Sequence, residues 1–285
     1  MGEKLFFARH KLIFNINTMK KIQKKSLLYK SDVDYVDYCV NHVVGCSHGC
    51  SFPCYAMLMA KRFGWIKEYQ DWIQPCLVEN SLDLLDKETP KLRERIKFVF
   101  LSLATDPFMF KQKDVEKHSL EIISRLNKDN IKVVTLTKGI YPKELVDKKY
   151  SSKNEYGITL VSLDSEFQKK YESGAASIKE RIKALEYLHK KGLKTWVSIE
   201  PYPTPNIIDQ NLSKILKRVK FVDKIVFGSW HYNSQVSKYP NAEDFYLDCS
   251  DILSEFCKKN RIKLHIKSGG SKDGRFRNPN IFNCH

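Results

Sequence analysis

A chain of 285 residues is long enough for one large α/β domain, and its hydrophobic fraction of 42% excludes a largely disordered protein. No stretch approaches the roughly 18 uninterrupted apolar residues of a membrane span, so no membrane association is expected. The formal net charge of +16 is uneven: residues 1–30 and 258–285 each contribute +7, and the residues between them contribute +2.

The two basic ends have two open interpretations. If they lie together, they form a basic surface that suits a polyanion such as nucleic acid. The same charges also serve solubility in a lysine-rich chain, and no nucleic-acid-binding motif accompanies them. We expect a basic N-terminal extension over residues 1–30, a single domain over 31–270 and a basic C-terminal tail over 271–285.

The start of the chain lacks the layout of a signal peptide. Lys4, Arg9 and Lys11 interrupt the only apolar run, and no small-residue cleavage site follows. We therefore expect a cytoplasmic protein. Because cytoplasmic thiols are normally reduced, eight cysteines indicate a metal or redox site rather than a disulfide framework.

The expected elements begin around a cysteine-rich loop, with a strand that ends at residues 43–44 and a helix over 55–63. From residue 97 onward, short apolar runs rich in β-type residues alternate with amphipathic stretches. The runs predict strands over residues 97–103, 131–137, 156–163, 193–199, 224–229 and 262–267. The stretches predict helices over 113–126, 177–191, 207–219 and 242–259.

Nearly continuous apolar runs are typical of strands buried on both faces, as in a parallel sheet. Repeated strand–helix units of this length predict an α/β fold, namely a partial (β/α)6-type, open TIM-like barrel with parallel strands. In such folds the functional residues lie at the C-terminal ends of the strands.

Three cysteines, Cys46, Cys50 and Cys54, lie within nine residues in a loop that contains Gly and Pro. Thiolates hold iron–sulfur clusters, and four of them complete a [4Fe–4S] cluster. Three clustered thiols leave one iron open to a small molecule. Two other interpretations remain open: a zinc site in which His48 is the fourth ligand, and unligated structural cysteines.

The cysteine loop and its surroundings resemble the radical S-adenosylmethionine superfamily, most closely the branch related to spore photoproduct lyase. The resemblance covers roughly residues 25–270 and continues in order through five further blocks. These blocks are Phe100-Leu101-Ser102-Leu103-Ala104-Thr105-Asp106-Pro107, Thr135-Leu136-Thr137-Lys138, Gly157-Ile158-Thr159-Leu160, Glu172-Ser173-Gly174-Ala175-Ala176-Ser177 with Arg181, and Ser198-Ile199-Glu200-Pro201.

The spacing of the cysteines departs from the family in one respect. The family usually has three residues and then two between its cysteines, whereas Pro53 lengthens the second gap to three. We expect the loop to absorb the extra residue, because a cluster needs only three converging sulfurs.

The resemblance implies a [4Fe–4S] cluster on Cys46, Cys50 and Cys54, with S-adenosylmethionine bound at the open iron. It implies reductive cleavage of S-adenosylmethionine to a 5′-deoxyadenosyl radical, which abstracts hydrogen from a substrate. The basic ends make nucleic acid the leading substrate class. An electron donor of flavodoxin or ferredoxin type is the expected partner. The alternative is a non-catalytic zinc or iron–sulfur protein that binds nucleic acid or transfers electrons.

Eight further residues are expected to contact the cofactor by the same resemblance. Tyr55 corresponds to an aromatic residue near the adenine. Ser102, Thr105 and Asp106 correspond to residues that contact the amino group of the cofactor. The alternative is that Thr105-Asp106-Pro107 only caps the next turn.

Lys138 corresponds to a ligand of the cofactor carboxylate. Ser162 is expected at the ribose or carboxylate, Arg181 at the carboxylate and Glu200 at the ribose or adenine. The alternatives are solvated side chains for Lys138 and Arg181, and a turn carboxylate for Glu200.

The remaining cysteines include Cys249, Cys257 and Cys284, which are candidates for a second metal centre or, alternatively, buried thiols and a tail residue.

Overall fold

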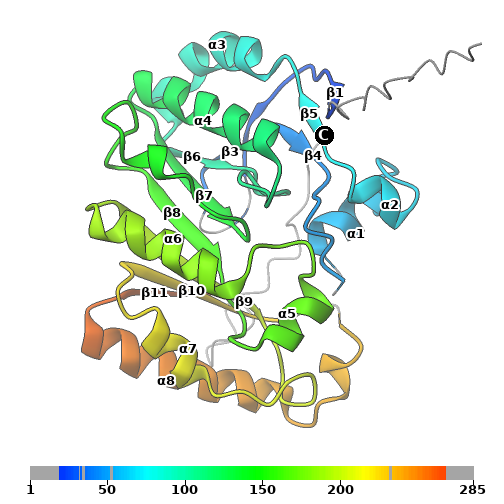
Figure 1. Cartoon of the computed structure of the whole chain (residues 1–285), viewed down its shortest axis with the longest axis vertical. Coiled ribbons are helices and arrows are strands. Elements are labelled where there is room, and N and C mark those ends of the chain that lie inside the picture. Colours follow the sequence, from blue (N-terminus) through cyan, green and yellow to red (C-terminus); the bar gives the residue numbers. More distant parts are fainter. Residues whose placement is uncertain (1–18, 32, 34–35, 52–53, 231–232, 268–285) are drawn as a thin grey trace, which may run out of the picture.

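The computed structural model describes residues 19–31, 33, 36–51, 54–230 and 233–267. Its main element is an eight-stranded sheet in the order β11-β10-β9-β8-β7-β6-β3-β2 (Figure 1). The strands are β2 (Leu28–Lys30), β3 (Tyr38–Val40), β6 (Phe98–Leu101), β7 (Lys132–Thr137), β8 (Glu155–Thr159), β9 (Lys194–Tyr202), β10 (Lys224–Ser229) and β11 (Lys263–Ile266).

All neighbouring strands of the main sheet are parallel except β2, which pairs antiparallel with β3. The six strands expected after residue 97 are present as β6 to β11. In the described part of the chain, the edge strands β2 and β11 do not pair with each other, so the barrel is open. The predicted α/β class with parallel strands is therefore confirmed.

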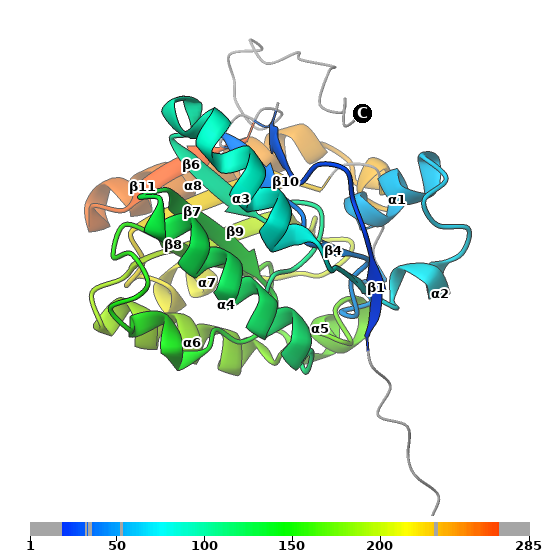
Figure 2. The same ribbon diagram turned by 90° about the horizontal axis from the view of Figure 1, so that it is seen from above.

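Helices α3 (Ser81–Leu92), α4 (Lys113–Lys128), α6 (Ile178–Lys190), α7 (Leu212–Arg218) and α8 (Ala242–Asn260) cover the main sheet (Figures 1 and 2). Three further helices, α1 (Tyr55–Arg62), α2 (Tyr69–Trp72) and α5 (Ser165–Tyr171), complete the described set. Ser177 and Glu180 form the expected capping box of α6. Helix α7 begins later than predicted, because the Asn211 side chain caps it by accepting from the Ser213 N–H at 2.8 Å.

A second sheet of three short strands lies beside the main one, in the order β1 (Lys20–Ile22), β5 (Cys76–Val78) and β4 (Val43–Val44). The predicted strand end at residues 43–44 is correct, but β4 belongs to this small sheet. The main-sheet strand that precedes the cysteine loop is β3. Both β1 and β2 lie N-terminal to the expected boundary at residue 30, and both pair with later strands.

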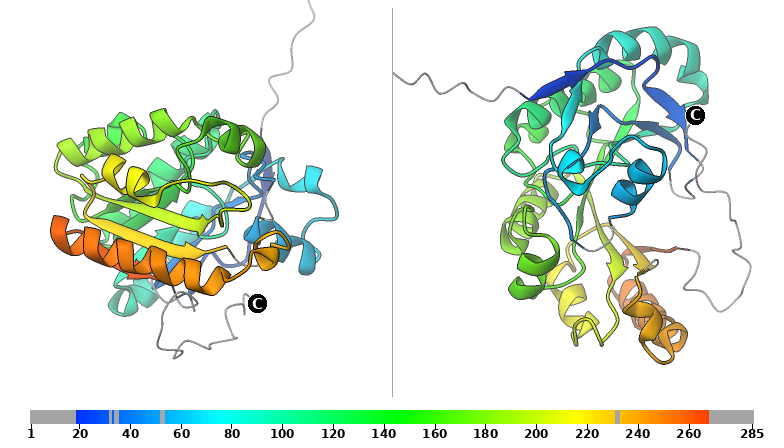
Figure 3. Two further views of the ribbon diagram at one scale, coloured as in Figure 1. Left: turned by 90° about the horizontal axis from the view of Figure 1, so that it is seen from below. Right: turned by 90° about the vertical axis from the view of Figure 1, so that its right-hand side faces the viewer.

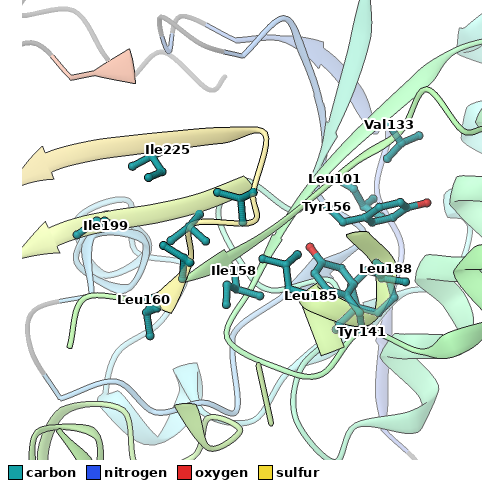
Figure 4. Packing of buried hydrophobic residues seen from close by; sticks show 14 of the residues in the cluster. Leu101, Val133, Tyr141, Tyr156, Ile158, Leu160, Leu185, Leu188, Ile199 and Ile225 are labelled. Atoms are coloured by element: carbon teal, nitrogen blue, oxygen red, sulfur yellow. The ribbon is translucent and has the colours of Figure 1, made fainter. Parts of the chain in front are cut away.

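The core has two parts on opposite faces of the main sheet. Leu185 and Leu188 of α6 meet Tyr156 and Ile158 of β8 in the larger cluster (Figure 4). Alternate strand residues face the other way and form a second cluster, which contains Phe100, Val134, Trp196 and Val226. Because both faces are apolar, the strands read as continuous hydrophobic runs, which is why the sequence predicted them well.

No helix in the described residues is long and apolar enough to cross a membrane. Cys249 and Cys257 are buried in the larger core cluster, while Cys284 lies outside the described residues, as do most of the two basic ends.

Candidate active site

The cysteine loop lies between β4 and α1, on the side toward which β7 and β8 run (Figure 1). The Cys46 N–H donates to the Trp72 carbonyl at 2.8 Å, and the Tyr69 hydroxyl donates to the Gly49 carbonyl at 2.6 Å. Gly49 has a φ of +55°, which favours glycine. Cys54 is the N-cap residue of α1, so the helix fixes the end of the loop. Pro53 lies outside the described residues.

The three thiols of the loop are free and partly buried. Burial raises the pKa of Cys46 well above its usual value, and the neighbouring Cys50 and Cys54 raise it further. Burial likewise raises the pKa of Cys50 to about 11. Three thiols in one loop are the donor type that iron–sulfur clusters use, and a bound metal displaces their protons. The chemistry of the donor set therefore fits a metal–sulfur cluster.

The same loop fits a single zinc ion poorly, because His48 is occupied within the protein. Its Nε2 accepts from the Phe110 N–H at 2.8 Å, and its Nδ1 lies 3.4 Å from Asp106 Oδ2. In the described ranges, no group of three His, Cys, Asp or Glu side chains, the three cysteines of the loop included, is arranged to hold a single ion.

Lys138, which follows β7, reaches the cysteine loop. Its ammonium lies 3.5 Å from the Cys50 sulfur and 3.0 Å from Glu172 Oε1. Burial alone would lower the pKa of Lys138, but Cys50 and Glu172 raise it above its usual value, so the side chain stays charged.

Glu172 links Lys138 to Arg181. Its Oε2 accepts from the Arg181 guanidinium at 2.5 Å, while Oε1 faces Lys138. Burial alone would raise the pKa of Glu172, but Lys138 and Arg181 hold it below its usual value. Arg181 is 1% exposed and also donates to the Ala176 and Thr159 carbonyls at 2.8 and 3.0 Å. All three of its donor groups therefore contact the protein.

Gly174 brings this ion-pair network to the cysteine loop. Its N–H donates to the His48 carbonyl at 3.0 Å. A Cβ atom at this position would lie 2.6 Å from the Ser47 carbonyl oxygen and 2.7 Å from that of His48. Only glycine permits this approach, so the segment between α5 and α6 packs directly on the loop.

Asp106 joins the loops after β6 and β7. Its Oδ1 accepts from the Phe108 N–H at 2.8 Å and the Thr137 hydroxyl at 2.6 Å, and its Oδ2 accepts from the Lys138 N–H at 2.7 Å. Asp106 thus holds the backbone from which the Lys138 side chain extends. Thr105 is partly buried, and its hydroxyl lies 3.4 Å from the Val43 carbonyl.

Ser102 belongs to a different buried chain of hydrogen bonds. Its Oγ lies 3.2 Å from His42 Nδ1, and His42 Nε2 lies 2.8 Å from Ser119 Oγ. The Ser119 hydroxyl donates to the Pro107 carbonyl at 2.5 Å, so it accepts from Nε2–H, and Nδ1 accepts from Ser102. Burial lowers the pKa of His42 well below its usual value, which keeps the ring neutral.

The other expected contacts lie on separate elements. Tyr55 is the first residue of α1, beside Cys54. The Ser162 hydroxyl follows β8 and accepts from the Asp164 N–H at 3.0 Å. Glu200, on β9, forms an ion pair with Lys267 at 2.7 Å. Both of these polar side chains have partners within the protein.

The structure brings Lys138 to Cys50, and it directs Ser102, Asp106 and Arg181 toward protein groups. Sequence reasoning assigned no role to Glu172, although the residue lies in one of the family-like blocks beside Gly174 and Arg181. The available signal was that Glu172 lies between Lys138 and Arg181 in the sequence.

The fold and the site together define an open barrel with a thiol-rich loop at the C-terminal ends of its strands. The model of the radical SAM superfamily matches residues 40–219. The chain therefore belongs to the radical SAM superfamily, whose members are enzymes that cleave S-adenosylmethionine by radical chemistry.

Two solved structures of spore photoproduct lyase are similar to the whole domain. The lyase complexed with dinucleoside spore photoproduct gives a TM-score of 0.60 at 12% identity, covering 86% of this chain and 80% of that chain. A mutant of the lyase with bound AdoMet and the dinucleoside gives 0.60 at 13% identity with the same coverage. At these identities the similarity shows the fold, that of a partial TIM-like barrel.

Among curated proteins, the uncharacterized protein ORF301 of Acidianus two-tailed virus is 23% identical over 188 residues. The aligned region covers 64% of this chain and 61% of that protein's length.

Proposed function

We propose that Cys46, Cys50 and Cys54 hold a [4Fe–4S] cluster with one iron open to S-adenosylmethionine, and that the enzyme abstracts hydrogen from a substrate. The observation that supports this proposal is the position of three thiols within nine residues of one loop, with the buried ammonium of Lys138 3.5 Å from the Cys50 sulfur. When bound and reduced, such a cluster supplies the electron that generates a 5′-deoxyadenosyl radical.

Lys138 is the residue proposed to bind the methionine carboxylate of the cofactor. A permanently charged ammonium beside Cys50 is complementary to a carboxylate that chelates the neighbouring iron. Glu172 and Arg181 keep the ammonium in position, because a buried ion pair fixes the geometry of its members. Arg181 thus supports the site through Glu172.

The remaining candidates fall into two groups by proposed role. Tyr55, Thr105, Ser162 and Glu200 are proposed to contact the adenosine or amino portion of the cofactor. Ser102 and Asp106 are proposed to support the loop after β6, since their side chains hydrogen-bond to His42, Thr137 and backbone N–H groups.

Nucleic acid is the substrate class we propose first. The basic ends of the chain suit a polyanion, and a dinucleoside is bound in both of the similar lyase structures. An electron donor of flavodoxin or ferredoxin type is proposed as the partner.

Anaerobic reconstitution with iron and sulfide, followed by reduction with dithionite in the presence of S-adenosylmethionine, tests the proposal. We expect about four irons per chain and formation of 5′-deoxyadenosine. Cys50→Ala is expected to lose both, while Cys76→Ala, a thiol of the neighbouring small sheet, keeps them. Zinc without iron or sulfide, or a reduced cluster that yields no product, would contradict the proposal.

A further inference from the structure

The segment around α1 and α2 carries an unusual concentration of exposed apolar side chains. Four of the six exposed large hydrophobic residues in the described part of the chain are Leu58, Phe63, Trp65 and Tyr69. Trp65 is 59% exposed and stacks on Phe63, with ring centroids 5.5 Å apart. We call these four residues the α1–α2 patch. Exposed aromatic side chains in one cluster are typical of protein interfaces.

The α1–α2 patch is the outer face of a thin layer whose inner face contacts the cysteine loop. On the inner face Ala60, Ile66 and Trp72 pack with Cys46 and Cys54. On the patch itself, the Tyr69 hydroxyl donates to the carbonyl of Gly49, between two of the cysteines. A molecule bound to the patch would therefore lie one helical layer from the cluster ligands.

Basic side chains surround the patch. Lys61, Arg62 and Lys67 are exposed. The two acidic residues of this segment, Glu68 and Asp71, form the capping box of α2, in which each carboxylate accepts from a backbone N–H. These two carboxylates stay charged on the α2 side of the segment. Helix α1 carries Lys61 and Arg62 in its last turn and no acidic residue, so the α1 side of the patch is positive and complementary to an acidic partner.

The patch and the proposed cofactor contacts come from different elements around the cysteine loop. Lys138 and Glu172 approach Cys50 from β7 and from the segment after α5, whereas residues of α1 and α2 pack with Cys46 and Cys54. Both helices project from one side of the molecule, beyond the helices that cover the main sheet (Figures 2 and 3). A protein on the patch would leave the strand ends free for substrate.

We propose that the α1–α2 patch docks an acidic redox protein that delivers single electrons to the cluster. One electron passes from the reduced flavin or iron–sulfur group of the partner to the cluster, so the partner is oxidised by one electron for each that the enzyme receives. Trp65 is the central apolar contact, and Lys61 and Arg62 steer the partner. This inference rests on the proposed function, because it requires a reducible cluster.

Stopped-flow reduction of the reconstituted enzyme tests the proposal, with a fully reduced flavodoxin as one reductant and dithionite as the other. In Trp65→Ala and in the double variant Lys61→Glu/Arg62→Glu, we expect the second-order rate with flavodoxin to fall about tenfold or more. The rate with dithionite should stay within about twofold of the wild type, because a small ion needs no docking surface.

Matched controls lie on α8, where Ile252 is also exposed and Lys258 and Lys259 are two exposed basic residues. Ile252→Ala and Lys258→Glu/Lys259→Glu should reduce at the wild-type rate with both reductants. Increasing salt should slow flavodoxin reduction of the wild type and have less effect on Lys61→Glu/Arg62→Glu.

Four results would overturn the proposal. Flavodoxin rates that are unchanged in the patch variants, or a wild type that only dithionite reduces, would exclude this surface as the docking site. If the patch variants lose binding to a fluorescent single-stranded oligonucleotide but keep the wild-type flavodoxin kinetics, the patch binds nucleic acid instead. If dithionite finds no reducible cluster in the wild type, the proposed function fails together with this inference.

Discussion

Two buried polar networks lie near the same edge of the main sheet, and they differ in where their hydrogen bonds end. The Ser102–His42–Ser119 chain terminates on the Pro107 carbonyl, so its donors and acceptors are all used within the protein. The Lys138–Glu172–Arg181 network ends instead on the Cys50 sulfur, at the proposed metal site.

The difference shows that a position at a strand end does not by itself identify a cofactor contact. Ser102 and Lys138 both follow strands of the main sheet, yet one faces a neutral histidine and the other a thiol of the loop. We therefore expect substitutions in the first network to change stability, and substitutions in the second to change cofactor binding.

The largest effect is expected for Lys138→Met. Loss of the ammonium should weaken S-adenosylmethionine binding by about 100-fold, as for removal of one partner of a desolvated charge pair. Equilibrium binding to the reconstituted protein measures the change. Lys132→Met is the matched control, because Lys132 is the first residue of β7, the strand that Lys138 follows, and pairs with Glu155 at 2.6 Å. Equal losses in both variants would contradict the assignment.

Glu172→Gln should have a smaller effect on binding. The amide keeps a hydrogen bond to Arg181 but loses the charge that holds Lys138, so we expect about tenfold weaker cofactor binding and about 2 kcal/mol lower stability. Titration with S-adenosylmethionine and urea denaturation measure the two effects. Reduced stability with unchanged binding would limit Glu172 to a structural role.

Ser119→Ala should act on stability alone. Removing the hydroxyl leaves the buried His42 Nε2–H without its acceptor, at a cost of about 1–2 kcal/mol. The free energy of unfolding of the metal-free protein measures this loss, and Ser124→Ala, at a partly buried position on the same helix, should change it by less than about 0.5 kcal/mol. A change in cofactor affinity would place the Ser102 network at the cofactor site.

Asp37 offers the smallest effect, far from both networks. Burial alone would raise its pKa, but Lys30 and the N–H groups of Lys97 and Phe98 lower it below its usual value. A carboxyl with a depressed pKa in the folded state stabilises the protein above about pH 4, and this contribution is lost as the pH falls through the folded pKa.

We therefore expect Asp37→Asn to cost about 1 kcal/mol at pH 7, and the difference from the wild type to shrink toward pH 3. Urea denaturation between pH 3 and pH 7 measures it. A difference that grows as the pH falls would contradict the assigned sign.

The sequence predicted the strands β6 to β11 and most helices, because buried parallel strands and amphipathic helices leave strong patterns. It missed β1 and β5 of the small sheet, because strands of three residues carry no periodicity. The resemblance assigned Lys138 to the cofactor, which stays a prediction, and it did not show that Arg181 faces Glu172. These two residues are nine positions apart and meet across the segment between α5 and α6, a tertiary contact that no local pattern encodes.

Electron paramagnetic resonance of the dithionite-reduced, reconstituted protein, recorded before and after addition of S-adenosylmethionine, tests most directly whether the three-cysteine cluster has an open iron. We expect a reduced [4Fe–4S] signal whose g values shift when S-adenosylmethionine is added, because the cofactor binds the iron that has no cysteine ligand. Ser119→Ala should show the same shift. A cluster signal that S-adenosylmethionine leaves unchanged in the wild type would contradict an open iron at Cys46, Cys50 and Cys54.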